Sequence, residues 1–237
     1  MKRLAAALLA LTILFAGCAR KISLPGPDYT LTVAETEFTE RRIHVRLQYP
    51  AVSDYADPAA QETCNALIVQ KAMNMYRRIG LSAPEDGEIV YSVTDVTVTL
   101  AARGFFSAVI AVTVESGGEK ELYAYTVNCD LEGERLLAGA DIVADFEKFR
   151  RAFVGGSYAT DIGREDILRE TLPADLLMPY KTEYGIYPDF YFREGKICVL
   201  TGVVPLLGGY AGFSADIRGA GYLNTADETV AMLAGKK

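Results

Sequence analysis

The alternation of apolar and polar residues near the start of the chain predicts two β-strands. Residues 29–35 and 42–48 alternate with a period of two, and Ile43, Val45 and Leu47 fall on one side of the second segment. Successive side chains of a strand point to opposite faces, so this pattern is typical of a strand with one buried face. We expect the two segments to pair as a hairpin.

A long amphipathic helix is predicted next. Asp57 followed by Pro58 is typical of a helix start, because an aspartate side chain caps free backbone amides and proline fits the first helical turn. The apolar residues that then recur at helical spacing are Cys64, Leu67, Ile68, Ala72, Met75 and Ile79. Gly80 and Pro84 end a segment of about 22 residues, whose apolar stripe must lie against a sheet.

Three further strands are predicted over residues 89–100, 105–114 and 121–129, joined by turns that contain glycine. We expect them to form an antiparallel meander. In the first of these strands the apolar phase shifts between Val93 and Val96, which predicts a β-bulge near Asp95. A buried polar site at that bulge is one possible consequence.

The rest of the chain predicts short helices and a second group of strands. Residues 141–180 show helical spacing, with Phe146, Phe149 and Phe153 on one face. A hairpin over residues 190–193 and 196–201, a strand near 213–217 and a weak helix over 224–233 complete the prediction.

This order of elements predicts an α+β fold in which antiparallel sheets pack against one long helix and several short helices, because strands and helices do not alternate as in a parallel sheet. No Ser/Gly-rich, Pro-rich or single-charge stretch interrupts the chain after residue 28. We therefore expect residues 28–237 to form a single domain of two packed layers.

The first residues predict an export signal. Lys2 and Arg3 precede an apolar run of about a dozen residues, which is too short for a helix that must cross about 30 Å of hydrocarbon. The stretch Leu14-Phe15-Ala16-Gly17-Cys18 resembles the lipobox of bacterial lipoproteins, although Phe15 stands where that pattern usually has leucine. The resemblance implies a signal peptide over residues 1–17, a lipid on Cys18, a tether over residues 18–27 and a place on the extracytoplasmic side of the cell membrane. An unlipidated secreted protein is the alternative.

The net charge argues against a nucleic-acid partner. Cleavage would remove Lys2 and Arg3 from the 24 basic residues, which leaves 22 against 31 acidic residues and a net charge of −9. Such a chain lacks the basic patch that a phosphate backbone requires. An acidic surface suits a cationic partner, although solubility alone would also explain it.

The cysteine and histidine content narrows the possible chemistry. Beyond Cys18 the chain has only Cys64, Cys129 and Cys198, which we expect to be small buried residues rather than a disulfide framework, with a bridge between Cys129 and Cys198 as the alternative. His44 is the only histidine, which excludes a histidine-rich metal site. It falls on the polar side of a strand, so an exposed strand residue is preferred over a catalytic base.

Three groups of residues carry a family resemblance. The first is Tyr49-Pro50, with Asn65 and Ile68 on the helix that follows. The second runs over residues 125–130 and continues through Gly133 to Ile142. The third comprises residues 190–200 with residues 209–212 downstream. In this order they resemble the extracytoplasmic domain shared by the lysozyme-sensing anti-sigma factor RsiV and the N-terminal part of the peptidoglycan deacetylase PdaC.

The resemblance implies a module that binds or senses a partner at the cell envelope, with lysozyme or a wall glycan as that partner. Two loops depart from the family pattern. Residues 117–120 read Gly-Gly-Glu-Lys where the family usually has Gly-Gly-Ala-His, and Arg218-Gly219 stands where Pro-Tyr is common. We therefore do not transfer to this chain any function that the family places on those two loops.

We therefore hold two hypotheses of different classes. The preferred one is a non-catalytic, lipid-anchored binding or sensing module without a cofactor or metal. The alternative is an accessory peptidoglycan hydrolase or deacetylase, which would need carboxylates converging in a cleft. Tyr184 and Tyr187, from an aromatic run over residues 180–192, are the candidate partner-binding residues because tyrosine is frequent at recognition surfaces. Core packing of the final hairpin is the simpler explanation of that run.

Overall fold

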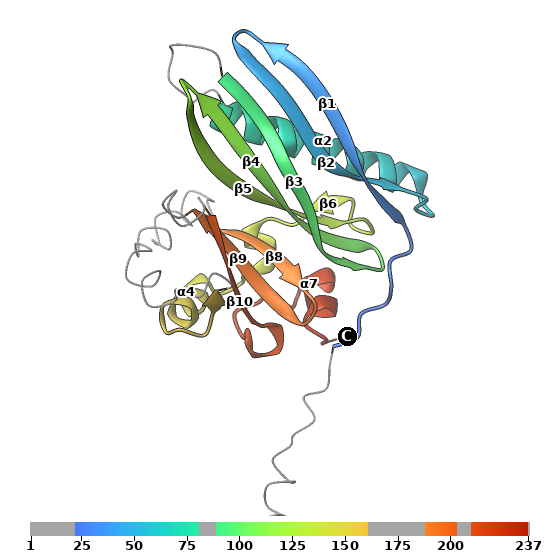
Figure 1. Cartoon of the computed structure of the whole chain (residues 1–237). Coiled ribbons are helices and arrows are strands. Elements are labelled where there is room, and N and C mark those ends of the chain that lie inside the picture. The colour runs from blue at the N-terminus through green and yellow to red at the C-terminus, as the bar shows by residue number, and fades with distance from the viewer. Residues whose placement is uncertain (1–21, 81–88, 161–187, 203–209, 237) are drawn as a thin grey trace, which may run out of the picture.

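The computed structural model describes residues 22–80, 89–160, 188–202 and 210–236. Its elements in chain order are β1 Thr30–Glu40, β2 Ile43–Ser53, α2 Pro58–Gly80, β3 Ile89–Ala102, β4 Phe105–Ser116, β5 Glu119–Asp130, β6 Arg135–Leu136, α3 Gly139–Ile142, α4 Phe146–Val154, β7 Ala159–Thr160, β8 Asp189–Arg193, β9 Lys196–Gly202, β10 Tyr210–Asp216, the 3-10 turn η3 Ile217–Gly219 and α7 Glu228–Leu233. Figure 1 shows their arrangement. The predicted α+β class is confirmed.

Six strands form the first sheet in the order β1-β2-β3-β4-β5-β6. The predicted hairpin is confirmed, with β1 and β2 antiparallel along their full length. The meander β3-β4-β5 is confirmed as well. The prediction of antiparallel pairing alone was incomplete, because β2 and β3 pair in parallel. A parallel neighbour requires a long crossover, and α2 supplies it.

The helix α2 begins and packs as predicted. The Asp57 carboxylate accepts hydrogen bonds from the amides of Ala59 (3.0 Å) and Ala60 (3.1 Å), which caps the first turn. Buried Ile68 and Cys64 face Leu47 and the other apolar residues of the sheet in one core. The helix α2 therefore covers one face of the first sheet.

A four-stranded antiparallel sheet in the order β7-β10-β9-β8 forms the second layer. The helices α3, α4 and α7 share a hydrophobic core with this sheet (Figure 1). Phe149 of α4 is the centre of its core, with aromatic rings 5.1 to 5.8 Å away that include Phe190, Tyr158 and Tyr222. The predicted aromatic face of this helix is confirmed, whereas the predicted helical residues 161–180 lie outside the described part of the chain.

The outer edge of β8 rests on the first sheet. The Asn128 side chain of β5 donates to the Phe190 carbonyl at 2.7 Å, and the Phe192 amide donates to the Ser107 hydroxyl of β4 at 2.9 Å. Ser107 in turn donates to the Asn128 side-chain oxygen at 2.7 Å. These buried side chains satisfy main-chain groups that would otherwise be unpaired, because β8 is an edge strand.

The predicted β-bulge in β3 is confirmed, but it does not form a buried polar site. The register between β3 and β4 shifts between Val93 and Asp95 and again between Val98 and Leu100. Asp95 is exposed to solvent, so the suggested buried polar site at this bulge was wrong. Among the described helices, none is long and apolar enough to cross a membrane.

Candidate functional site

The residues that the sequence selected as sites fall outside the described part of the chain. This holds for Cys18, the expected lipid attachment, and for Tyr184 and Tyr187, the expected partner contacts. Their roles stay predictions.

Other members of the same aromatic run are part of the core. Phe190, Tyr191 and Phe192 of β8 are each no more than 2% exposed, which confirms the alternative of core packing for these three residues. Tyr210 is half-buried beside the small cluster of Tyr191, Cys198 and Leu200. The aromatic residues of this hairpin therefore hold the two sheets together and do not form a recognition surface.

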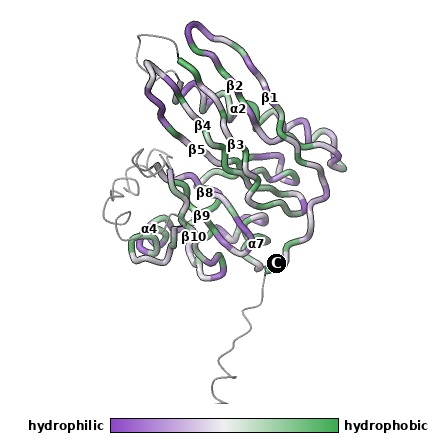
Figure 2. Tube along the Cα trace, viewed as in Figure 1, coloured by the Kyte–Doolittle hydropathy of each residue, from purple (hydrophilic) through white to green (hydrophobic). Residues whose placement is uncertain are grey.

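Among the described residues, the surface most available to a partner is the part of the first sheet that neither α2 nor the second sheet covers. We call it the open face. Its residues, on five adjacent strands, are Glu35, Glu37, His44, Arg46, Val90, Ser92, Thr113 and Leu122. Figure 2 shows the alternation of hydrophilic and hydrophobic positions along these strands.

Strand alternation explains which side chains reach the open face. In β2, His44 and Arg46 are exposed whereas their neighbours Val45 and Leu47 are buried against α2. In β4 the same face is fully covered at Ser107 and half-buried at Thr113. The cover provided by the second sheet therefore ends part-way along the strands.

Charged side chains on the open face form an ordered array. The Arg46 guanidinium lies 3.1 Å from the Glu35 carboxylate and 3.4 Å from that of Glu37. Gln48 donates to Glu35 at 2.7 Å. The hydrogen bond from Gln48, together with Arg46, lowers the pKa of Glu35, so this group remains a carboxylate and is not suited to donate a proton as a general acid.

A shallow groove of about 480 Å³ crosses β1, β2 and β3 on this face. His44 and Arg46 form part of its polar wall, and Val90, which is 37% exposed, supplies an apolar floor. His44 and Thr39 are joined by a hydrogen bond of 3.0 Å. The prediction that His44 is an exposed strand residue is confirmed. Fixed charges, hydrogen-bonding groups and an exposed aliphatic side chain suit a protein or glycan contact.

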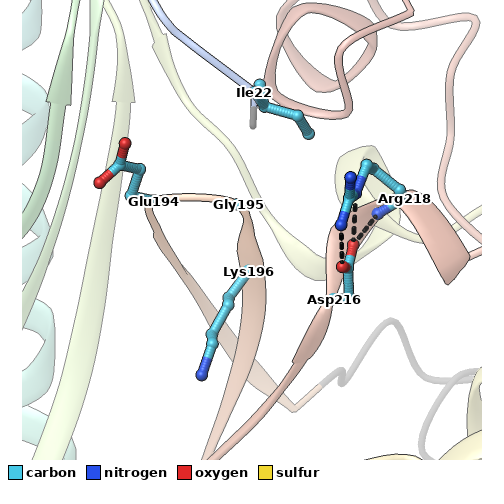
Figure 3. A pocket seen from close by; sticks show the side chains of 6 residues that line it. All are labelled: Ile22, Glu194, Gly195, Lys196, Asp216 and Arg218. Atoms are coloured by element: carbon cyan, nitrogen blue, oxygen red, sulfur yellow. Dashed lines mark hydrogen bonds and ion pairs between the residues drawn. The ribbon is translucent and has the colours of Figure 1, made fainter. Parts of the chain in front are cut away.

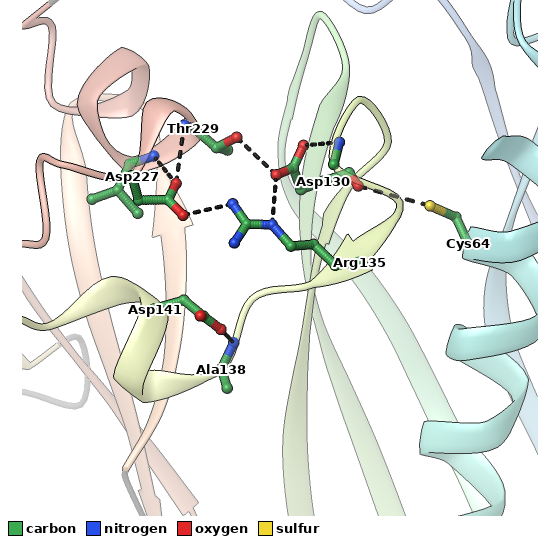
Figure 4. A network of polar contacts seen from close by, with 9 residues as sticks. Cys64, Asp130, Arg135, Ala138, Asp141, Asp227 and Thr229 are labelled. Atoms are coloured by element: carbon green, nitrogen blue, oxygen red, sulfur yellow. Dashed lines mark hydrogen bonds and ion pairs between the residues drawn. The ribbon is translucent and has the colours of Figure 1, made fainter.

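Two of the three described cysteines share one part of the core, and the third lies in another. Cys64 and Cys129 share the core under α2, and the Cys64 thiol donates to the Asp130 carbonyl at 3.8 Å (Figure 4). Cys198 lies in the small cluster between the sheets. All three are buried, and none of them is in a disulfide. The expectation of small buried residues is confirmed, and the suggested bridge between Cys129 and Cys198 is not formed.

Comparison with known proteins finds no matching protein-family profile and no matching curated protein. A crystal structure of a member of the DUF3298 family from Bacteroides fragilis has a TM-score of 0.51 and 14% identity, and the match covers 90% of this chain and 100% of that one. The chain has the fold of a DUF3298 protein. A DUF3298 family protein from Pseudomonas aeruginosa matches with a TM-score of 0.47 and 12% identity over 85% of this chain and 94% of that one.

Within this DUF3298-like fold, Asp189 is the described carboxyl group whose environment most resembles that of an acid catalyst, because burial raises its pKa. The described charged groups that act on it are Lys71 and Arg78, and Thr126 donates to it at 3.4 Å. A glycosidase needs a second carboxyl group roughly 5 to 10 Å away, and these neighbours are cations. In the described residues, no group of three or more histidines, cysteines and acids could hold a metal ion.

Proposed function

We propose that this protein is a lipid-anchored, extracytoplasmic binding or sensing module with a DUF3298-like fold. Its open face contacts a cationic protein such as lysozyme, or a wall glycan. The lipobox-like sequence that ends at Cys18 supports the anchor, and the resemblance to the lysozyme-sensing domains supports the class of partner.

The open face is the observation that carries this proposal. A half-covered sheet leaves a groove of about 480 Å³ and an exposed acid, Glu37, whose side chain is 65% exposed. The mature chain would carry a net charge of −9. Such a charge speeds the encounter with a cationic protein and disfavours anionic partners.

Binding of the full-length protein to hen lysozyme at physiological salt tests the partner. We expect saturable binding with a Kd below about 1 μM. The Glu37→Lys variant should bind roughly ten-fold more weakly, because it reverses a charge within the contact. Glu147→Lys is the matched control: Glu147 is 50% exposed on α4, away from the open face. Its effect should be about two-fold or less because of salt screening.

Two results would contradict this assignment. Absence of binding at about 100 μM, a concentration at which even a weak specific contact is occupied, would exclude lysozyme and direct the search to wall glycans. Hydrolysis or deacetylation of purified peptidoglycan by the protein alone would replace the binding role with the enzymatic one. In that case Asp189→Asn, which removes the half-buried acid with the raised pKa, is the first variant to assay.

The anchor has its own test. Cells supplied with labelled palmitate should transfer label to the wild-type chain and not to Cys18→Ala, because the proposed lipid is attached to that thiol. Equal labelling of the two chains would contradict lipidation at Cys18.

A further inference from the structure

The beginning and the end of the described chain meet at one end of the molecule (Figure 1). Ile22 and Leu24 pack against the core of the second sheet. A methyl group added at Gly235 would lie 3.2 Å from the Ile22 side chain, so the two segments are in close contact. The position at which the chain joins the domain is therefore fixed by packing.

Only three residues, Ala19 to Lys21, separate Cys18 from Ile22. Four Cα steps of at most about 3.6 Å reach roughly 14 Å. A lipid on Cys18 would hold this end of the domain within that distance of the membrane surface, which is shorter than the length of either sheet strand β1 or β2.

The same end carries basic residues in an otherwise acidic protein. We call it the basal end; its described exposed cations include Lys196 at the start of β9, Arg218 in η3 and Lys236 after α7. A cavity of about 240 Å³ lies between Ile22, Lys196 and Arg218 (Figure 3). The acids beside it are Glu194 and Asp216, and Asp216 accepts a hydrogen bond of 2.6 Å from Arg218.

The sequence next to both described termini is also basic. Arg20 and Lys21 directly precede Ile22, and Lys237 follows Lys236. Among the described residues of this end, the three exposed cations outnumber the two acids beside the cavity by one. Cations near an anionic leaflet are attracted to it, and the attraction falls off within a Debye length.

We propose that the basal end is a membrane-contact surface that rests on anionic phospholipid headgroups. This inference rests on the proposed lipid anchor at Cys18. It also gives the orientation of the proposed binding module. The β1-β2 and β4-β5 turns lie at the opposite end (Figure 1), so the open face stands away from the bilayer and toward the wall.

Energy transfer from labelled protein to labelled headgroups tests this orientation. Full-length lipoprotein is reconstituted into vesicles of phosphatidylglycerol and phosphatidylethanolamine that carry an acceptor dye on the headgroup. Donor dye is attached at Glu194→Cys in the β8-β9 turn or at Glu119→Cys at the start of β5, next to the β4-β5 turn. The two positions are matched, because each substitution removes one exposed glutamate at the end of a hairpin.

We expect transfer from position 194 to exceed transfer from position 119 by roughly three-fold or more, since the strands that separate the two ends are about 40 Å long. In the double variant Lys196→Glu with Lys236→Glu this ratio should fall by about half. The control pair Arg77→Glu with Lys120→Glu makes the same charge change on exposed residues elsewhere, and should leave the ratio unchanged. On vesicles of phosphatidylcholine, which carry no net negative charge, the wild-type protein should show the same reduced ratio of transfer as the double variant.

The outcomes separate the two proposals. Protein that fails to sediment with vesicles contradicts the lipid anchor itself. Sedimentation with equal transfer from both positions leaves the anchor standing and overturns the orientation. A ratio that is unchanged in the basal charge variant overturns the contact with anionic headgroups.

Discussion

The Arg135 guanidinium joins the Asp227 carboxylate at 2.5 Å and the Asp130 carboxylate at 3.0 Å (Figure 4). Asp130 ends β5 of the first sheet, and Asp227 caps α7 through the amides of Thr229 and Val230. The side chains of Asp130 and Asp227 are 4% and 8% exposed. One cation therefore holds two nearly buried acids together and ties the last helix to the first sheet.

Removal of the Arg135 guanidinium should destabilise the fold strongly. Arg135→Met keeps most of the aliphatic volume but leaves the Asp130 and Asp227 carboxylates side by side without compensation, and we expect a loss of about 3 to 5 kcal/mol in the free energy of unfolding. Urea unfolding followed by circular dichroism measures it. The control Arg150→Met breaks an exposed pair with Glu147 within α4 and should cost about 0.5 kcal/mol. Equal losses in the two variants would refute this role.

The contact between β8 and the first sheet gives a second prediction. Asn128→Ala leaves the Phe190 carbonyl without its donor and the Ser107 hydroxyl without its acceptor, both in a buried interface. Unsatisfied buried groups cost about 1 to 3 kcal/mol each, so we expect a total loss of about 2 to 4 kcal/mol in urea unfolding. Asn74→Ala, on the exposed side of α2, is the control and should change stability by less than about 0.5 kcal/mol. A neutral Asn128→Ala would mean that water or a shift of β8 replaces the lost bonds.

The close contact of Gly212 in β10 with Tyr191 gives a third prediction. A Cβ at this position would overlap the Tyr191 hydroxyl oxygen, and Tyr191 is only 2% exposed, so its ring has no open space to move into. Gly212→Ala should cost about 1 to 3 kcal/mol through overpacking. In a Tyr191→Phe background the overlapping oxygen is gone, and the same substitution should become nearly neutral, as a double-mutant cycle would show. Gly219→Ala, where a Cβ meets nothing within 4 Å, is the control.

Local patterns were sufficient to predict most of the elements. The β1-β2 hairpin, α2, the meander and the β8-β9 hairpin follow from periodicity and from cap and turn residues, which are properties of neighbouring positions. The parallel pairing of β2 with β3 was missed because it depends on where α2 returns the chain. Which strands belong to which sheet was left open, since polar residues such as Ser107 and Asn128 gave no indication that they would receive an edge strand.

Only part of the candidate site could be predicted from local sequence patterns. Alternation in β2 placed His44 on the polar face, which the structure confirms. How much of that face stays uncovered depends on how far the second sheet extends over Ser107 and Thr113, a tertiary property with no local signal. The basal end is also tertiary, because Ile22 and Gly235 lie at opposite ends of the sequence.

The pH dependence of stability gives the last prediction. Burial and a hydrogen bond to Glu40 raise the pKa of Tyr76 to about 12, and burial with a hydrogen bond to Glu121 does the same for Tyr123. An unfolded tyrosine ionises near 10. Because the folded pKa is the higher one, the stabilisation is complete below pH 10 and is lost as the pH rises from about 10 to about 12.

An alkaline titration followed by phenolate absorbance and urea unfolding checks this sign. The folded protein should show phenolate formation delayed beyond pH 10, whereas in concentrated urea all 14 tyrosines should titrate together near pH 10. Tyr91 and Tyr125, whose pKa values burial raises, should ionise only as the protein unfolds. Tyr76→Phe should make the loss of stability between pH 10 and pH 12 shallower. A stability that is flat over this range would show that these hydroxyls reach solvent in the folded state.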